Sequence, residues 1–218
     1  MSFTPLNDIT SSRVTGGDGG FCMTRIMVVV GSVRPGRIGL PIAEWVSVAL
    51  AGHEGVEVDL VDLAELSLPL MDEPNHPRLQ NYTHQHTLDW SERVDAADGF
   101  VFVTPEYNHS FSPALKNAID FLHNEWFRKP VGFVSYGGIS AGTRGVLALK
   151  PVLAAVGLVP ASVAVEIPFA ARQLDDEGQF QPIEAQERNL AAVAEELVAL
   201  GSALEPLQRR RVAQHAAA

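Results

Sequence analysis

The sequence predicts an α/β protein in which an open parallel sheet carries helices on both faces. The first observation is that short apolar runs alternate with helical patterns about five times along the chain. This alternation is typical of parallel strands joined by crossover helices. The second is that three connecting loops, GSVRPGRIG, TPEYNHS and SYGGISAGTRG, have unusual compositions. Ligands of such folds bind beyond the carboxyl ends of the strands, so these loops form the candidate site.

The predicted strands are short apolar runs bounded by turn or polar residues. RIMVVVG at 25–31 is continuously apolar, as expected of a strand that is covered on both faces. VEVDLVDL at 56–63 alternates apolar and polar residues and predicts a second strand. The remaining strands are expected at 99–104, 130–138 and 159–167.

The predicted helices follow the strands in order. Over 38–50, apolar residues recur at i, i+4, i+7, i+8 and i+11, which is one face of a helix. Further helices are expected at 86–98, 113–126, 143–157 and 184–204. Pro113 suits the first position of its helix, where a missing N–H costs nothing. Pro151 lies inside a predicted helix, which it is expected to kink or split.

The length and composition indicate a single domain. The chain has 218 residues, of which 46% are hydrophobic, enough for one sizeable core. We expect the domain to span residues 24–204, with residues 1–23 as a disordered extension and residues 205–218 as a frayed tail. The single cysteine, Cys22, excludes an internal disulfide. With no signal-peptide pattern and no membrane-length apolar stretch, this predicts a cytoplasmic protein.

The charge balance limits the partners. The formal net charge is −10, so the chain lacks the positive field that general binding to nucleic acids or anionic membranes requires. Any anion that the protein binds must therefore be held by a local site.

The first loop, GSVRPGRIG, is a candidate anion site. It matches neither the dinucleotide motif GxGxxG nor the P-loop. Ser32 supplies a hydroxyl, Arg34 and Arg37 supply two guanidinium groups, and the helix that follows supplies free backbone N–H groups. We favour a phosphomonoester site over the alternative of a solvated loop with incidental arginines.

The other two loops complete the candidate site. TPEYNHS offers the ring of Tyr107 and the amide of Asn108, and SYGGISAGTRG contains four glycines that permit close approach of a flat ligand. Taken alone, the glycine loop is equally well explained as a turn. Together with the anion loop, these features predict a mononucleotide site.

GSVRPGRIG, TPEYNHSFSPALKNAIDFL and KPVGFVSYGG followed by GTRG resemble the NADPH-dependent FMN reductase family, and the resemblance runs from about residue 25 to 200. It implies a flavodoxin-like, three-layer α/β/α fold with a five-stranded parallel sheet in the order 2-1-3-4-5. It also implies FMN as the cofactor, NADPH or NADH as the co-substrate, and a homodimer or homotetramer built around the helix that begins at Pro113.

The resemblance also implies the roles of individual residues. The FMN phosphate is expected at Ser32, Arg34, Arg37, Ile38 and Gly39. The ribityl chain and isoalloxazine ring are expected against Pro105, Glu106, Tyr107 and Asn108, with Ser135, Gly137 and Gly138 closing the other side. Many relatives carry glycine in place of His109, and Ser or Asn in place of Arg37 or Ile38.

The implied activity is a hydride transfer from NAD(P)H to FMN, followed by reduction of a flavin, quinone, azo compound or metal oxyanion in a ping-pong cycle. No catalytic side chain is expected, because the cofactor carries the chemistry. The alternatives are a flavodoxin-type electron carrier, which suits the acidic charge, and a non-redox phosphate sensor. Arg144 is expected to face solvent or to bind a nucleotide phosphate. His84 and His86 are expected to be solvated, with no metal site.

Overall fold

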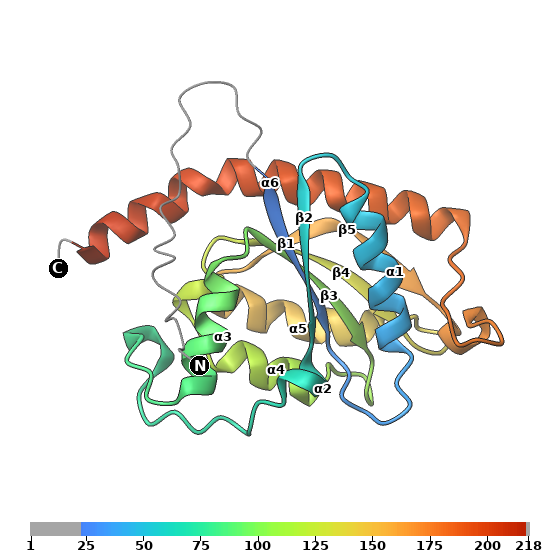
Figure 1. Cartoon of the computed structure of the whole chain (residues 1–218), viewed down its shortest axis with the longest axis horizontal. Helices are drawn as coiled ribbons and strands as arrows, with labels where there is room; N and C mark the ends of the chain where they lie inside the picture. Colours follow the sequence, from blue (N-terminus) through green and yellow to red (C-terminus); the bar gives the residue numbers. More distant parts are fainter. Residues whose placement is uncertain (1–22, 217–218) are drawn as a thin grey trace, which may run out of the picture.

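The computed structural model describes residues 23–216 of the chain, and the side chains of residues 23–208. Its five strands form one parallel sheet in the order β2-β1-β3-β4-β5, which confirms the expected fold (Figure 1). The strands are β1 (Thr24–Val30), β2 (Val56–Asp62), β3 (Gly99–Pro105), β4 (Pro130–Tyr136) and β5 (Val159–Ile167). The predicted N-terminal extension lies outside the described residues, apart from its last position.

Helices cover both faces of the sheet. One face packs against α1 (Gly39–Ala51) and α6 (Glu184–Ala216). The other packs against α3 (Gln85–Asp95), α4 (Pro113–Asp120) and α5 (Thr143–Val156). A single turn, α2 (Leu63–Leu66), follows β2, and three 3₁₀ turns complete the elements: η1 (Pro77–Leu79), η2 (Asn124–Trp126) and η3 (Ala170–Gln173).

The alternation of side chains along the central strands explains their continuous apolar sequences. In β1, Ile26 and Val28 point toward α1 and α6, whereas Met27 and Val29 point toward the opposite layer. Because both faces of the strand are covered there, positions 26–30 are all buried and apolar. Large aromatic side chains fill the α3–α4–α5 side, where the Trp126 ring lies 4.9 Å from that of Phe100.

Helix α4 ends at Asp120, six residues before the expected end. Two buried indoles explain the early stop. Trp90 Nε1 donates a hydrogen bond to the carbonyl of Ala118 at 2.9 Å, and Trp126 Nε1 donates to that of Ile119 at 3.0 Å. These side chains satisfy carbonyl groups that a longer helix would otherwise use for its next turn.

Two helices differ from the expectation based on proline and composition. α5 continues as one helix through Pro151, which is exposed, so the helix is not split there. α6 continues to Ala216, through most of the region expected to fray. Glutamine, arginine and alanine predominate there, and all three favour helix. Over residues 23–216, none of the helices combines the length and apolar content needed to cross a bilayer.

Candidate functional site

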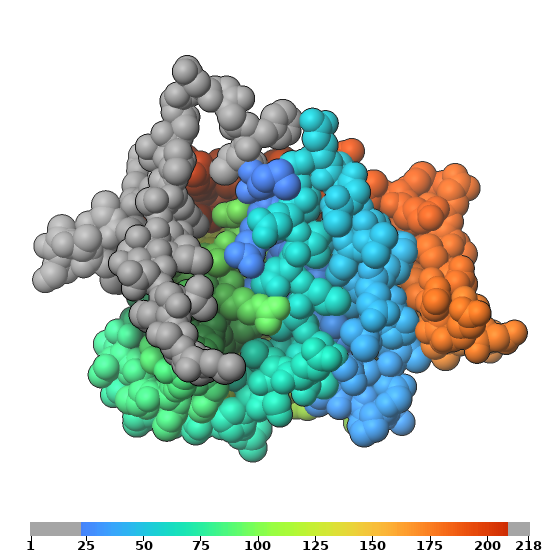
Figure 2. Space-filling view, viewed as in Figure 1, coloured from blue at the N-terminus to red at the C-terminus, as the bar shows by residue number. Residues whose placement is uncertain are grey.

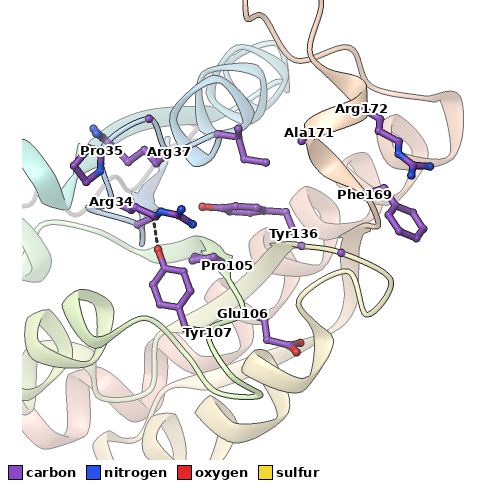
Figure 3. Close-up of a pocket in the computed structure, with 15 residues that line it drawn as sticks. Arg34, Pro35, Arg37, Pro105, Glu106, Tyr107, Tyr136, Phe169, Ala171 and Arg172 are labelled. Carbon is purple, nitrogen blue, oxygen red and sulfur yellow. Dashed lines mark hydrogen bonds between the residues drawn. The ribbon is translucent and has the colours of Figure 1, made fainter.

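Loops at the carboxyl ends of four strands enclose a cavity of about 500 Å³ (Figure 3). They follow β1, β3, β4 and β5. The predicted residues that line this cavity are Ser32, Arg34, Arg37, Ile38, Pro105, Glu106, Tyr107, Gly137 and Gly138. Gly39, Asn108 and Ser135 are not among its lining residues. The cavity is also lined by residues that were not predicted from the sequence, namely Pro35, Gly36, Tyr136, Phe169, Ala171 and Arg172.

The two arginines of the first loop differ in their surroundings. Arg34 is exposed at the cavity, and no carboxylate within the described part of the chain pairs with it. Arg37 instead forms an ion pair with the buried carboxylate of Asp62, at the end of β2. The same carboxylate accepts a hydrogen bond from the backbone N–H of Ala64 at 3.0 Å. The loop therefore presents one unpaired guanidinium to an anion, whereas the sequence predicted two.

A hydrogen bond of 2.8 Å between Ser32 Oγ and the Tyr107 hydroxyl joins the first loop to the β3–α4 loop. Tyr107 and Ser110 exchange two backbone hydrogen bonds, of 2.9 and 3.0 Å. Between them, Asn108 and His109 both have positive φ, at 50° and 65°. Two such residues inside a hydrogen-bonded pair form a tight hairpin turn of type I′ character. Asn108 thus forms an exposed turn and does not line the cavity.

Tyr136, the last residue of β4, points from the sheet toward the loop that holds Arg34 and Arg37 (Figure 3). Its hydroxyl is buried and has no hydrogen-bond partner in the described region. Burial raises the pKa of this phenol, so the hydroxyl stays protonated near neutral pH and can donate. A Cβ atom on Gly39 would lie 2.3 Å from the Tyr136 oxygen. Glycine at the first position of α1 therefore makes room for this phenol.

Glu106 ties the β3–α4 loop to the β4–α5 loop. Its carboxylate accepts hydrogen bonds from Arg144 Nε at 2.7 Å and from Ser140 Oγ at 3.0 Å, and it forms an ion pair with Arg144 Nη2 at 2.6 Å. Burial alone would raise the pKa of Glu106, but these hydrogen bonds and the charge of Arg144 outweigh it and lower the pKa. Arg144 therefore pairs with a carboxylate, and its side chain, 44% exposed, also faces solvent as expected.

The fourth side of the cavity is formed by residues that follow β5, and it was not predicted from the sequence. Phe169 N–H donates to the Gly138 carbonyl at 3.1 Å, and Ala170 N–H donates to that of Gly137 at 3.2 Å. The Arg172 guanidinium lies 4.7 Å from the centre of the Phe169 ring. The chain then forms a lobe that projects from the body of the molecule, at the right of Figure 2. The only sequence signal was an aromatic residue and an arginine placed directly after a strand.

His84 and His86 lie away from this cavity. Their rings stack at 5.2 Å, and His86 Nε2 lies 3.0 Å from a carboxylate oxygen of Asp72. No group of three or more histidine, cysteine, aspartate or glutamate side chains suited to a metal ion occurs in the described region.

The Glu106→Gln variant is expected to lose roughly 1–2 kcal/mol of unfolding free energy at pH 7, because it removes the ion pair and weakens the hydrogen bonds. The folded-state pKa of Glu106 lies below the ordinary value of 4.5, so its contribution is present above that pH and is lost as the pH falls through the folded-state pKa. Urea unfolding at pH 7 and about pH 3 should thus show the difference from the parent shrinking in acid. Glu187→Gln, at an exposed position of α6, is the control; a difference that stays constant with pH contradicts this account.

Comparison with known proteins identifies the family of the chain. Residues 24–172 match the family model described as NADPH-dependent FMN reductase. An NAD(P)H-dependent FMN reductase of Nectria sp is 35% identical over 156 residues, covering 68% of this chain and 77% of that protein. Another from Schizosaccharomyces pombe is 42% identical over 120 residues, covering 54% of this chain and only 60% of that protein.

A solved structure shares the fold. The flavoenzyme NAD(P)H:(acceptor) oxidoreductase FerB from Paracoccus denitrificans superposes with a TM-score of 0.67 at 22% sequence identity. The match covers 81% of this chain and 98% of that protein.

Proposed function

The chain belongs to the NADPH-dependent FMN reductase family, and from this premise we propose that it is an FMN-dependent NAD(P)H oxidoreductase. Bound FMN would supply the redox chemistry, accepting hydride from NAD(P)H and passing the electrons to a flavin, quinone, azo compound or metal oxyanion in a ping-pong cycle. The single cysteine and the family support a cytoplasmic location.

One observation carries the proposal. An anion site and a wall formed by Gly137 and Gly138, here called the glycine wall, face the same cavity. At the anion end, Arg34 is unpaired, and the buried Tyr136 hydroxyl lacks a partner. The first turn of α1 has no side-chain cap, so its backbone N–H groups can also bind an anion. A buried hydroxyl without a partner is costly, and a phosphate oxygen is an acceptor that would satisfy it. These groups fit a phosphomonoester such as that of FMN.

The glycine wall fits a flat ring. A Cβ on Gly138 would meet no atom within 4 Å, so this residue borders open space. The Gly137 N–H already donates to the Ile167 carbonyl at 3.2 Å. Among the described residues no backbone carbonyl accepts a hydrogen bond from the Gly138 N–H. This N–H is therefore the donor best able to stabilise negative charge on a reduced flavin ring. Pro105, at the end of β3, and Tyr107, in the β3–α4 loop, also line the cavity.

Reduction under anaerobic conditions tests the proposal. The purified protein is supplied with FMN, freed of excess cofactor and titrated with NADPH while the flavin absorbance is followed. We expect a yellow protein that bleaches. A yellow protein that does not bleach indicates the alternative, a flavodoxin-type electron carrier. A protein that takes up no FMN contradicts both.

We also propose a homodimer or homotetramer that uses the α4 side of the molecule. Asn117 of α4 is hydrogen-bonded to the link between α2 and α3, residues 67–84. It accepts a hydrogen bond from Met71 N–H at 3.0 Å and donates one to the Pro69 carbonyl at 2.7 Å. Leu70 and Leu79 of this link are 85% and 69% exposed. Exposed leucine side chains on this side of the molecule are available for a protein–protein contact.

Light scattering is expected to give two or four times the chain mass of 23.5 kDa. Leu70→Asp should reduce that mass, because a buried unpaired charge opposes association. Val48→Asp is the control, since Val48 of α1 is also highly exposed but lies on the opposite face of the sheet. A parent protein of monomer mass overturns the proposal.

A further inference from the structure

We propose that Arg172 and Phe169 form a second anion subsite, which binds a phosphate of the pyridine dinucleotide. Arg172 is exposed and lines the cavity, and no carboxylate in the described part of the chain pairs with it. In a chain of net charge −10, an unpaired guanidinium at a cavity is a local attraction for an anion. This inference rests on the proposed function, because it concerns the substrate of that reaction.

The subsite is separate from the FMN phosphate site. Figure 3 shows Arg34 and Arg37 on one side of Tyr136 and Phe169 and Arg172 on the other, where the Phe169 and Arg172 side chains extend outward at the rim of the cavity. A single phosphomonoester at Arg34 leaves the opposite guanidinium unused. A pyridine dinucleotide, which must enter the same cavity to reduce a bound flavin, brings further phosphate groups of its own.

The subsite is held in place by the glycine wall. Phe169 has a φ of 48°, a left-handed conformation that is uncommon for a bulky residue, and its N–H is bonded to the Gly138 carbonyl. Strain of this kind is concentrated at functional sites. The Arg172 guanidinium lies over the Phe169 ring, 4.7 Å from its centre, and this contact limits the conformational freedom of the arginine side chain. Less entropy is then lost when an anion binds.

Arg144 was the other candidate for this role. Its guanidinium is paired with the carboxylate of Glu106 at 2.6 Å, so an anion binding there would have to displace that carboxylate. Arg172 faces no such competition. Its guanidinium can form two parallel hydrogen bonds with phosphate oxygens, the geometry for which arginine is well suited.

Calorimetric binding of NADP⁺ and NAD⁺ to the FMN-loaded protein tests the subsite without requiring turnover. Arg172→Gln is expected to weaken NADP⁺ binding about tenfold, the effect of losing a charge-assisted hydrogen bond. Phe169→Leu should act in the same direction by releasing the guanidinium. Arg188→Gln makes the same charge change on an exposed part of α6 and should leave NADP⁺ affinity unchanged.

Each outcome decides the inference. If Arg172→Gln weakens NADP⁺ but not NAD⁺, the subsite binds the 2′-phosphate; if it weakens both equally, the subsite binds the pyrophosphate. Unchanged affinity for both nucleotides, in variants whose thermal unfolding matches the parent, overturns the proposal. So does weaker FMN binding with unchanged NADP⁺ binding, which would assign Arg172 to the FMN site. Failure of the proposed function is recognised separately, as a parent protein that takes up no FMN or is not bleached by NADPH.

Discussion

Replacing Arg37 by alanine is expected to lower the free energy of unfolding by about 3 kcal/mol, because it leaves a buried carboxylate without its cation. The Asp62 side chain is only 4% exposed, and after the substitution the one hydrogen bond left to it among the described residues is that from the Ala64 N–H. Urea unfolding of the protein without added FMN, at pH 7, measures the loss.

The Arg34→Ala variant is the matched comparison from the same loop. Because Arg34 is exposed and unpaired among the described residues, its removal should change the unfolding free energy by no more than about 0.5 kcal/mol. It should instead weaken FMN binding by roughly 1.5–3 kcal/mol, the range for a hydrogen bond to a charged group. If Arg37→Ala keeps its stability but loses FMN, both arginines bind the phosphate, as the family resemblance implied. An unchanged FMN affinity of Arg34→Ala would remove that residue from the site.

The Gly39→Ala variant is expected to lose roughly 2 kcal/mol of stability and to bind FMN at least about tenfold more weakly. Its new methyl group would lie 2.3 Å from the oxygen of Tyr136, a residue that is buried. Either α1 or the phenol must shift, and both border the anion site. Gly201→Ala is the control: it lies within α6 with nothing within 4 Å of the added atom, and should gain about 0.5–1 kcal/mol.

A double mutant isolates the clash. Tyr136→Phe removes the offending oxygen, after which the nearest ring atom to the Gly39 methyl is Cζ, at 3.1 Å. The double variant should thus recover part of the stability lost by Gly39→Ala, a non-additive result expected of residues in direct contact. Tyr136→Phe alone removes a buried hydroxyl that lacks a partner, so it should not destabilise the protein without added FMN, but should weaken FMN binding. Additive effects would show that the two residues do not compete for space.

The sheet could be predicted from the sequence because its strands are buried on both faces. That burial produces the continuous apolar runs of β1 and β3, and the alternation with helices then limits the connections to parallel crossovers. The end of α4 could not be predicted in the same way. It depends on Trp90, which comes from a different helix and caps a carbonyl 28 residues away.

The candidate site was predictable where it consists of contiguous loop residues. GSVRPGRIG and TPEYNHS contribute neighbouring side chains to one cavity, as their positions after β1 and β3 required. The pairing of Arg37 with Asp62 was not predictable, because spacing along the chain does not reveal which charges meet in space. Tyr136 was overlooked because its position in an apolar strand is equally typical of a core residue. The β5 wall carried no motif at all.

Helix α6 has a consequence for measurements in solution. Its 33 residues span about 50 Å, roughly twice the length of a seven-residue strand, and Figure 1 shows its end extending past the sheet. A molecule with such a projecting rod diffuses more slowly than a sphere of equal mass. Its hydrodynamic radius should therefore exceed that of a compact 23.5 kDa protein, and even a single chain should elute early from a gel-filtration column.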